Sequence, residues 1–150
     1  MNWTSNKSLM LSRICVAVFA VLLLALDIGC YRVVRWFFVE IRGTSPIHAA
    51  GLMVSVYCGS IFAWICLNQL WRLLGNLRGG AVFTRENVIC MRCISWCCMC
   101  AAAICLVSAV YYLPFVFVAI AAGFMGLIVR IVKNAFQQAI VMKDELDLTI

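Results

Sequence analysis

The stretch that decides the fold is Val16-Ala-Val-Phe-Ala-Val-Leu-Leu-Leu-Ala-Leu26, which contains no polar side chain. A helix on the surface of a soluble protein carries polar residues along one face, and this stretch has no such face. The whole chain of 150 residues agrees, because 66% of it is hydrophobic, only 12% is charged, and its mean hydropathy is +1.05. Soluble domains are about one quarter charged. The composition therefore excludes a soluble catalytic domain or a DNA-binding domain and predicts a chain that lies mainly in lipid.

Outward from this stretch, four apolar segments follow one another, and each meets the requirement of about 20 residues for a helix that crosses about 30 Å of hydrocarbon. The connections are short, which makes sequential helices antiparallel neighbours. We therefore predict one all-α domain, an integral membrane four-helix bundle with antiparallel helices and a short C-terminal tail at 141–150. The helices are expected at about 11–31, 47–70, 86–112 and 115–140.

Basic residues predict the orientation, because cytoplasmic segments retain Lys and Arg during insertion. Arg32, Arg35 and Arg42 lie on one side of the predicted membrane. The other side carries the remaining nine of the 12 basic residues: Lys7, Arg13, Arg72, Arg78, Arg85, Arg92, Arg130, Lys133 and Lys143. We therefore predict a multi-pass protein of the cell (inner) membrane with both termini in the cytoplasm (N-in/C-in).

Ten cysteines raise the question of metal or redox chemistry, which Cys90 and Cys93 could serve as a Cys-x-x-Cys pair. Zinc sites usually combine two such pairs, and the sole histidine, His48, is on the opposite side of the membrane. A membrane disulfide oxidoreductase is disfavoured because this pair faces the reducing cytoplasm. We therefore expect no metal, no cofactor, no catalytic residue and no enzymatic activity. The four-residue spacing favours a packing stripe of small residues instead: Cys93, Cys97, Ala101 and Cys105.

A second stripe of small residues lies on the second predicted helix, where it would allow a helix backbone to approach closely. Its members are Gly51, Ser55, Gly59 and Ala63. The fourth helix repeats the pattern more weakly with Ala119, Ala122, Gly123 and Gly126. Such stripes join helices of one chain or of two copies, so a homo-oligomer is possible.

Asp27 is the only acidic residue inside a predicted span, and an ionisable group there indicates function by default. A proton-coupled transporter needs such a carboxylate near the middle of the membrane. Asp27 lies instead within about four residues of the predicted outer helix end, where Arg32 and His48 are near. We therefore predict a structural ion pair or an interface anchor.

Charged residues also gather in the second connection and in the tail. Thr84 is suited to cap the third helix, with Glu86 in its first turn. The tail alternates acidic and aliphatic residues, and acidic groups do not anchor a chain to anionic lipid. We therefore expect the tail to be a projecting helix end, or a strand-like peptide, that docks on a protein.

Two segments carry a family resemblance. Residues 80–92, with Phe83, Thr84, Glu86, Asn87 and Arg92, and the terminal residues 145–150 resemble the bacterial membrane proteins catalogued as domain of unknown function 2975. The resemblance extends to length and to the layout of four spans, although the cysteines of the third helix are not part of the family pattern.

Members of that family are commonly encoded beside a small Cro/CI-like helix-turn-helix regulator. The resemblance therefore implies a membrane protein that binds or sequesters a cytoplasmic helix-turn-helix transcriptional regulator, in response to a membrane signal. The chain itself would contact the lipid bilayer and the regulator, but no nucleic acid. Alternatives are a small-molecule transporter and an accessory or structural subunit of a membrane complex. The residues expected to bind the partner are Arg72, Arg78, Arg85, Asp144, Glu145 and Asp147.

Overall fold

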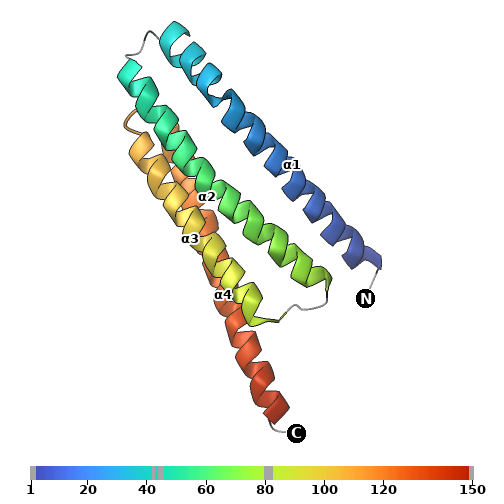
Figure 1. Cartoon of the computed structure of the whole chain (residues 1–150). Coiled ribbons are helices and arrows are strands. Elements are labelled where there is room, and N and C mark those ends of the chain that lie inside the picture. The colour runs from blue at the N-terminus through green and yellow to red at the C-terminus, as the bar shows by residue number, and fades with distance from the viewer. Residues whose placement is uncertain (1–2, 42, 44–45, 80–82, 149–150) are drawn as a thin grey trace.

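A computed structural model describes residues 3–41, 43, 46–79 and 83–148, and in these ranges the chain is helical without any strand (Figure 1). This confirms the predicted all-α fold. Each α-helix contains a segment that is long and apolar enough to cross a membrane. The elements are α1 (Trp3–Val34), the π-helix η1 (Arg35–Ile41), α2 (Pro46–Arg78), α3 (Arg85–Ser108) and α4 (Phe115–Leu148).

The helices extend beyond the apolar segments, because the polar residues that flank those segments do not break a helix. α2 continues past the apolar stretch 47–70 and ends at Arg78, directly before Gly79 and Gly80. At its other end, Gly43 adopts a left-handed backbone with φ of 59°, which suits glycine, and Pro46 begins α2. Consequently Arg72 and Arg78, which we placed in a connection, lie on the last turns of α2.

The helices pack in chain order. α1 lies against α2, α2 against α3, and α3 against α4. Within the described chain, the backbone of α1 approaches only α2 and the adjoining η1, and that of α4 approaches only α3. The four helices therefore form an open row, and most large apolar side chains of α1 are exposed, as expected for a face that contacts lipid.

Both termini lie at one end of this row, together with the connection between α2 and α3 (Figure 1). We call this the termini end. The opposite end, which we call the turn end, holds η1 and the connection between α3 and α4. A buried cluster at the turn end joins α1 to α2 through Cys30, Val34, Ala49 and Leu52.

Only part of the stripe predicted on α2 makes a close contact within the chain. A Cβ atom on Gly51 would lie 3.1 Å from the Cζ atom of Tyr111, so the close neighbour is an aromatic side chain rather than a helix backbone. Ser55 donates a hydrogen bond to the carbonyl of Gly51 in its own helix, at 3.0 Å. A Cβ atom on Gly59 would meet no described atom within 4 Å, so Gly59 makes no close contact with another helix in the described chain. Its packing role therefore stays a prediction, for contact with a second copy.

Among the glycines, the closest approach to a neighbouring helix is instead at Gly126, in the pattern that appeared weaker in sequence. A Cβ atom on Gly126 of α4 would lie 3.2 Å from the Cβ of Cys98 and 3.3 Å from the Sδ of Met99. The buried Ser95 hydroxyl donates a hydrogen bond to the carbonyl of Gly126 at 2.9 Å. Gly123 lies next to Ala102 in the same seam.

The cysteine stripe is therefore not the face that α4 contacts. α3 has two helical neighbours and needs two packing faces, and the row formed by Ser95, Cys98, Met99 and Ala102 serves α4. In the predicted stripe, Cys97 is buried, and the other members are half-buried: Cys93, Ala101 and Cys105.

Candidate functional site

A polar cluster joins α1 to α2 around Asp27. The Ser60 hydroxyl donates a hydrogen bond to Oδ1 of Asp27 at 2.6 Å, and the Trp64 Nε1–H donates to Oδ2 at 2.9 Å. The Tyr57 hydroxyl donates to the main-chain carbonyl of Asp27 at 3.2 Å. Both carboxylate oxygens are therefore held by donors of one neighbouring helix.

This geometry corrects the expected position and partners of Asp27. The helical path does not end near Tyr31, because α1 continues to Val34 and η1 continues to Ile41. Ser60 lies near the middle of the apolar stretch 47–70, so the carboxylate is also near mid-depth. The partners that the structure shows are neutral donors of α2, in place of the Arg32 and His48 that we expected.

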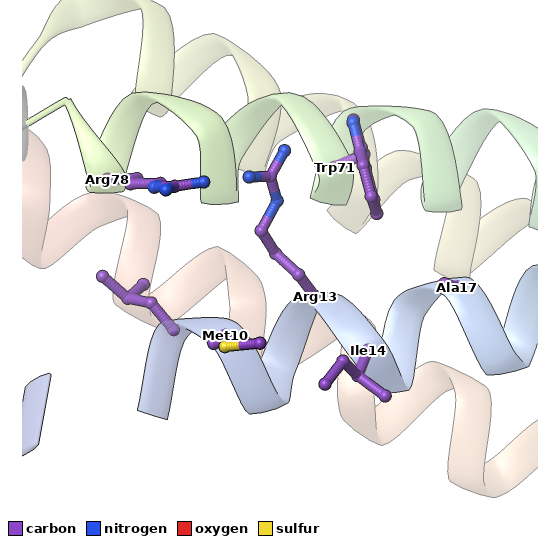
Figure 2. Close-up of a pocket in the computed structure, with 7 residues that line it drawn as sticks. Met10, Arg13, Ile14, Ala17, Trp71 and Arg78 are labelled. Atoms are coloured by element: carbon purple, nitrogen blue, oxygen red, sulfur yellow. The ribbon is translucent and has the colours of Figure 1, made fainter. Parts of the chain in front are cut away.

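A cavity of about 670 Å³ opens between the termini-end halves of α1 and α2 (Figure 2). Arg13 extends from α1 toward α2, and its guanidinium carbon lies 4.6 Å from the centre of the Trp71 ring. The Nε atom of Arg13 is buried and has no hydrogen-bond partner among the described residues. The cavity is lined by Leu9, Met10, Arg13, Ile14, Ala17, Trp71 and Arg78.

A second cavity of about 470 Å³ continues this hollow seam toward the middle of the membrane. Trp71 lines both cavities, and Trp64, which binds Asp27, lines the second. The second cavity is lined by Val16, Ala20, Trp64, Ile65, Leu67, Asn68 and Trp71. We refer to the two cavities together as the α1–α2 seam.

The residues that carry the family resemblance form a junction at the termini end. The Asn76 side chain donates a hydrogen bond to Oδ1 of Asn87 at 3.0 Å, and Asn87 is almost fully buried. The rings of Phe83 and Phe136 lie 5.5 Å apart, centre to centre, which joins the start of α3 to α4. The motif thus connects α2, α3 and α4.

Thr84 occupies the N-cap position of α3 as predicted, but its side chain makes no capping bond. Its main-chain carbonyl accepts hydrogen bonds from the amides of Asn87 and Val88, at 3.2 and 3.4 Å. The buried Oγ1 atom has no hydrogen-bond partner among the described residues. Thr84 therefore begins the helix through its backbone conformation.

The C-terminal part of α4 projects beyond the start of α3. Phe136 lies beside Phe83, which precedes α3, so residues 137–148 extend past that level for about 18 Å. Figure 1 shows this part of α4 beyond the ends of α2 and α3. The tail is therefore helical up to Leu148. One side of this projecting end is a shallow recess lined by Asn134, Gln137, Gln138, Val141, Met142 and Glu145.

The residues predicted to bind a partner lie in different places. Arg72 and Arg85 are exposed at the termini end, whereas Arg78 lines the α1–α2 seam beside Arg13. Asp144 and Glu145 are exposed on the projecting end of α4. The Asp147 side chain, like residues 149–150, lies outside the description.

Sequence reasoning missed that Arg13 contacts Trp71 and lines one cavity with Arg78. Arg13 was visible only as one basic residue near an apolar stretch, and nothing in sequence sets the register of α1 against α2. For metal binding, the described residues contain no group of three His, Cys, Asp or Glu side chains arranged to hold an ion.

Four long helices in a row, each with a segment apolar and long enough to cross a membrane, define a multi-pass membrane protein. The family model described as protein of unknown function (DUF2975) matches residues 15–150, and the chain belongs to this family. Searches of curated proteins and of solved structures found no match.

Proposed function

We propose that this protein is a non-enzymatic platform in the cell membrane that holds a cytoplasmic helix-turn-helix transcriptional regulator. The observation that carries the proposal is the projecting end of α4, a helix that continues beyond its packing partner and ends in acidic and aliphatic residues. A helix end that served only to cross the membrane would not need this extension.

The exposed side chains of the projecting end suit a protein partner. Val141, Met142 and Leu146 are each more than half exposed, and Asp144 and Glu145 are exposed between them. A helix that combines apolar and acidic side chains can dock in a groove of a partner, with the apolar residues supplying contact area and the charges supplying orientation. A regulator that reads DNA presents a basic surface, which an acidic helix complements.

The family membership agrees with this proposal, since the resemblance implies a neighbouring Cro/CI-like regulator. Arg72 and Arg85 lie at the same end of the row and would contact a part of the regulator other than its basic surface. The release of the regulator would respond to a signal that reaches the helices from the membrane.

A small-molecule transporter is the second candidate, favoured by the mid-depth carboxylate of Asp27. An ionisable group at that depth is a common feature of ion-coupled pathways. The two candidates make different demands on α4, because a transporter gains nothing from an acidic helix end outside the membrane.

Deletion of residues 144–150 is expected to abolish co-purification of the proposed helix-turn-helix regulator, while insertion and folding stay intact. Reversal of Asp144, Glu145 and Asp147 to Lys is expected to weaken binding about tenfold or more at low salt, since about 1.4 kcal/mol corresponds to a factor of ten. The loss should shrink as salt is raised, because salt screens exposed charges. The measurement is the affinity of a tagged regulator for the detergent-solubilised protein.

The matched control is Glu86→Lys, which reverses an exposed acidic residue at the same end but on α3. It should leave the affinity unchanged. If the truncated protein retains the regulator at full affinity, the projecting end is not the docking element.

The proposal also requires the termini end to face the cytoplasm. A cytoplasm-dependent reporter fused after Ile150 is expected to be active, and a cysteine in place of the exposed Glu40 of η1 should react with a membrane-impermeant thiol reagent added outside. The parent protein, with its native cysteines, supplies the background. An inactive reporter, together with no labelling of the position of Glu40 from outside, would reverse the orientation.

A further inference from the structure

We infer that the α1–α2 seam binds one phospholipid with an anionic headgroup, which lies between Arg13 and Arg78 while an acyl chain follows the seam inward. This site is independent of the proposed regulator docking. It differs from general attraction of basic residues to a lipid surface, because it has walls and a defined depth.

Charge identifies the headgroup. Two guanidinium groups, from Arg13 of α1 and Arg78 of α2, face the first cavity, and none of its described lining residues is acidic. Arginine is the cation best suited to phosphate oxygens, since its planar group offers several donors in a fixed arrangement. A phosphate between the two helices would neutralise both.

The second observation is the buried Nε atom of Arg13. A buried donor without an acceptor is costly, and native structures rarely leave one unsatisfied. Trp71 holds the guanidinium by a cation–π contact but offers no acceptor oxygen. A phosphate oxygen in the cavity would supply the missing acceptor.

The shape of the seam identifies the rest of the ligand. Beyond the arginines its walls are mainly apolar, with Ile14 and Ala17 in the first cavity and Val16 and Ile65 in the second. From Arg78 to Trp64 the seam covers about 21 Å along α2, somewhat more than the half-thickness of a hydrocarbon core about 30 Å thick. The hydrogen bonds of Asp27 to Ser60 and Trp64 lie at its deep end.

An anionic head followed by a long apolar tail matches these walls, and inorganic phosphate matches only the mouth. A lipid bound in the seam would belong to the membrane leaflet at the termini end. Bound there, the lipid would contact α1 and α2 at once. It would therefore stabilise α1, whose backbone approaches only α2 and η1 within the described chain.

The test uses the full-length protein, delipidated in a non-ionic detergent. Phosphatidylglycerol, phosphatidylcholine and inorganic phosphate are added separately, and the melting temperature and the lipid-bound mass by native mass spectrometry are recorded. We expect phosphatidylglycerol to raise the melting temperature in proportion to its occupancy and to appear as a one-to-one complex, because a ligand that binds only the folded state stabilises it. Phosphatidylcholine and phosphate should have little effect.

Variants separate the specific site from general charge effects. Arg13→Gln and Arg78→Gln should each weaken phosphatidylglycerol binding about tenfold, the usual effect of losing one charge-assisted hydrogen bond. Ala20→Phe, which fills the second cavity and leaves both arginines in place, should lower the binding as well. Arg32→Gln is the control, since it removes one positive charge from the turn-end part of α1.

Equal stabilisation by phosphatidylcholine would overturn the inferred headgroup recognition. Equal stabilisation by inorganic phosphate would show that the site binds an anion and that the acyl chain contributes nothing. If Arg32→Gln weakens binding as much as Arg13→Gln, the lipid is held by net charge and the seam is not its site. A variant that fails to fold is identified by its melting curve without lipid, and its partner, Arg13→Gln or Arg78→Gln, then decides the outcome.

Discussion

Replacement of Gly126 by leucine is expected to destabilise the folded protein by about 3 kcal/mol, at the upper end of the usual cost of overpacking a well-packed site. Even a Cβ atom at this position would lie 3.2 Å from the Cβ of Cys98, an atom fixed to the backbone of α3. The larger side chain must therefore separate α3 from α4 and break the hydrogen bond from Ser95 to the Gly126 carbonyl. Thermal or denaturant unfolding in detergent measures the change.

Gly59→Leu is the matched control for this prediction. It makes the same substitution inside another helix, α2, where a Cβ atom meets no described atom within 4 Å. Leucine also has a better helix propensity than glycine, so the control should be neutral or slightly stabilising. An equally large loss at Gly59 would show that another copy of the chain covers that face, and would contradict the assignment of the closest contact to the seam between α3 and α4.

Replacement of Asp27 by leucine is expected to weaken the association of α1 with α2 by about 1–3 kcal/mol. This range covers the net free energies of hydrogen bonds between membrane helices and of hydrogen bonds to charged groups. The variant leaves the donors of Ser60 and Trp64 without their acceptor. α1 has no other helical neighbour in the described chain except η1, so nothing compensates for the loss. A photo-crosslinking residue at Ala20, which lines the seam, should then crosslink to α2 several times less efficiently.

Asp27→Asn should give an intermediate result, because the amide retains one acceptor oxygen. Ser55→Ala is the control, since that hydroxyl bonds only within its own helix. Unchanged crosslinking in Asp27→Leu would show that apolar packing alone holds α1 in place.

The four helices could be predicted from sequence because a backbone in lipid must satisfy its hydrogen bonds internally, which leaves a long apolar segment few alternatives to a helix. The helix ends could not be predicted as well. Residues 71–78 are polar enough to suggest a connection. Gly75 is the one glycine or proline among them, and a helix tolerates a single glycine. α2 therefore continues to Arg78, directly before Gly79.

The contacts between helices were less accessible. Small residues on α2 and α4 were visible, but their spacing does not show which neighbour they face. The weaker pattern, around Gly126, is the one whose glycine lies closest to a neighbouring helix. Asp27 was visible, whereas its donors on α2 depend on the register between two helices. The same register brings Arg13 to Trp71 and Arg78, and a single sequence contains no information that sets it.

The length of α4 has a mechanical consequence. From Gly126, where it is held against α3, to Leu148 the helix measures about 33 Å, and a rigid rod of that length converts rotation into displacement. A tilt of about 10° around the Gly126 contact moves the far end by about 6 Å. A change in bilayer thickness that alters the tilt of this helix would thus displace its far end. The exposed acidic and aliphatic side chains lie on that end, so they would move with it.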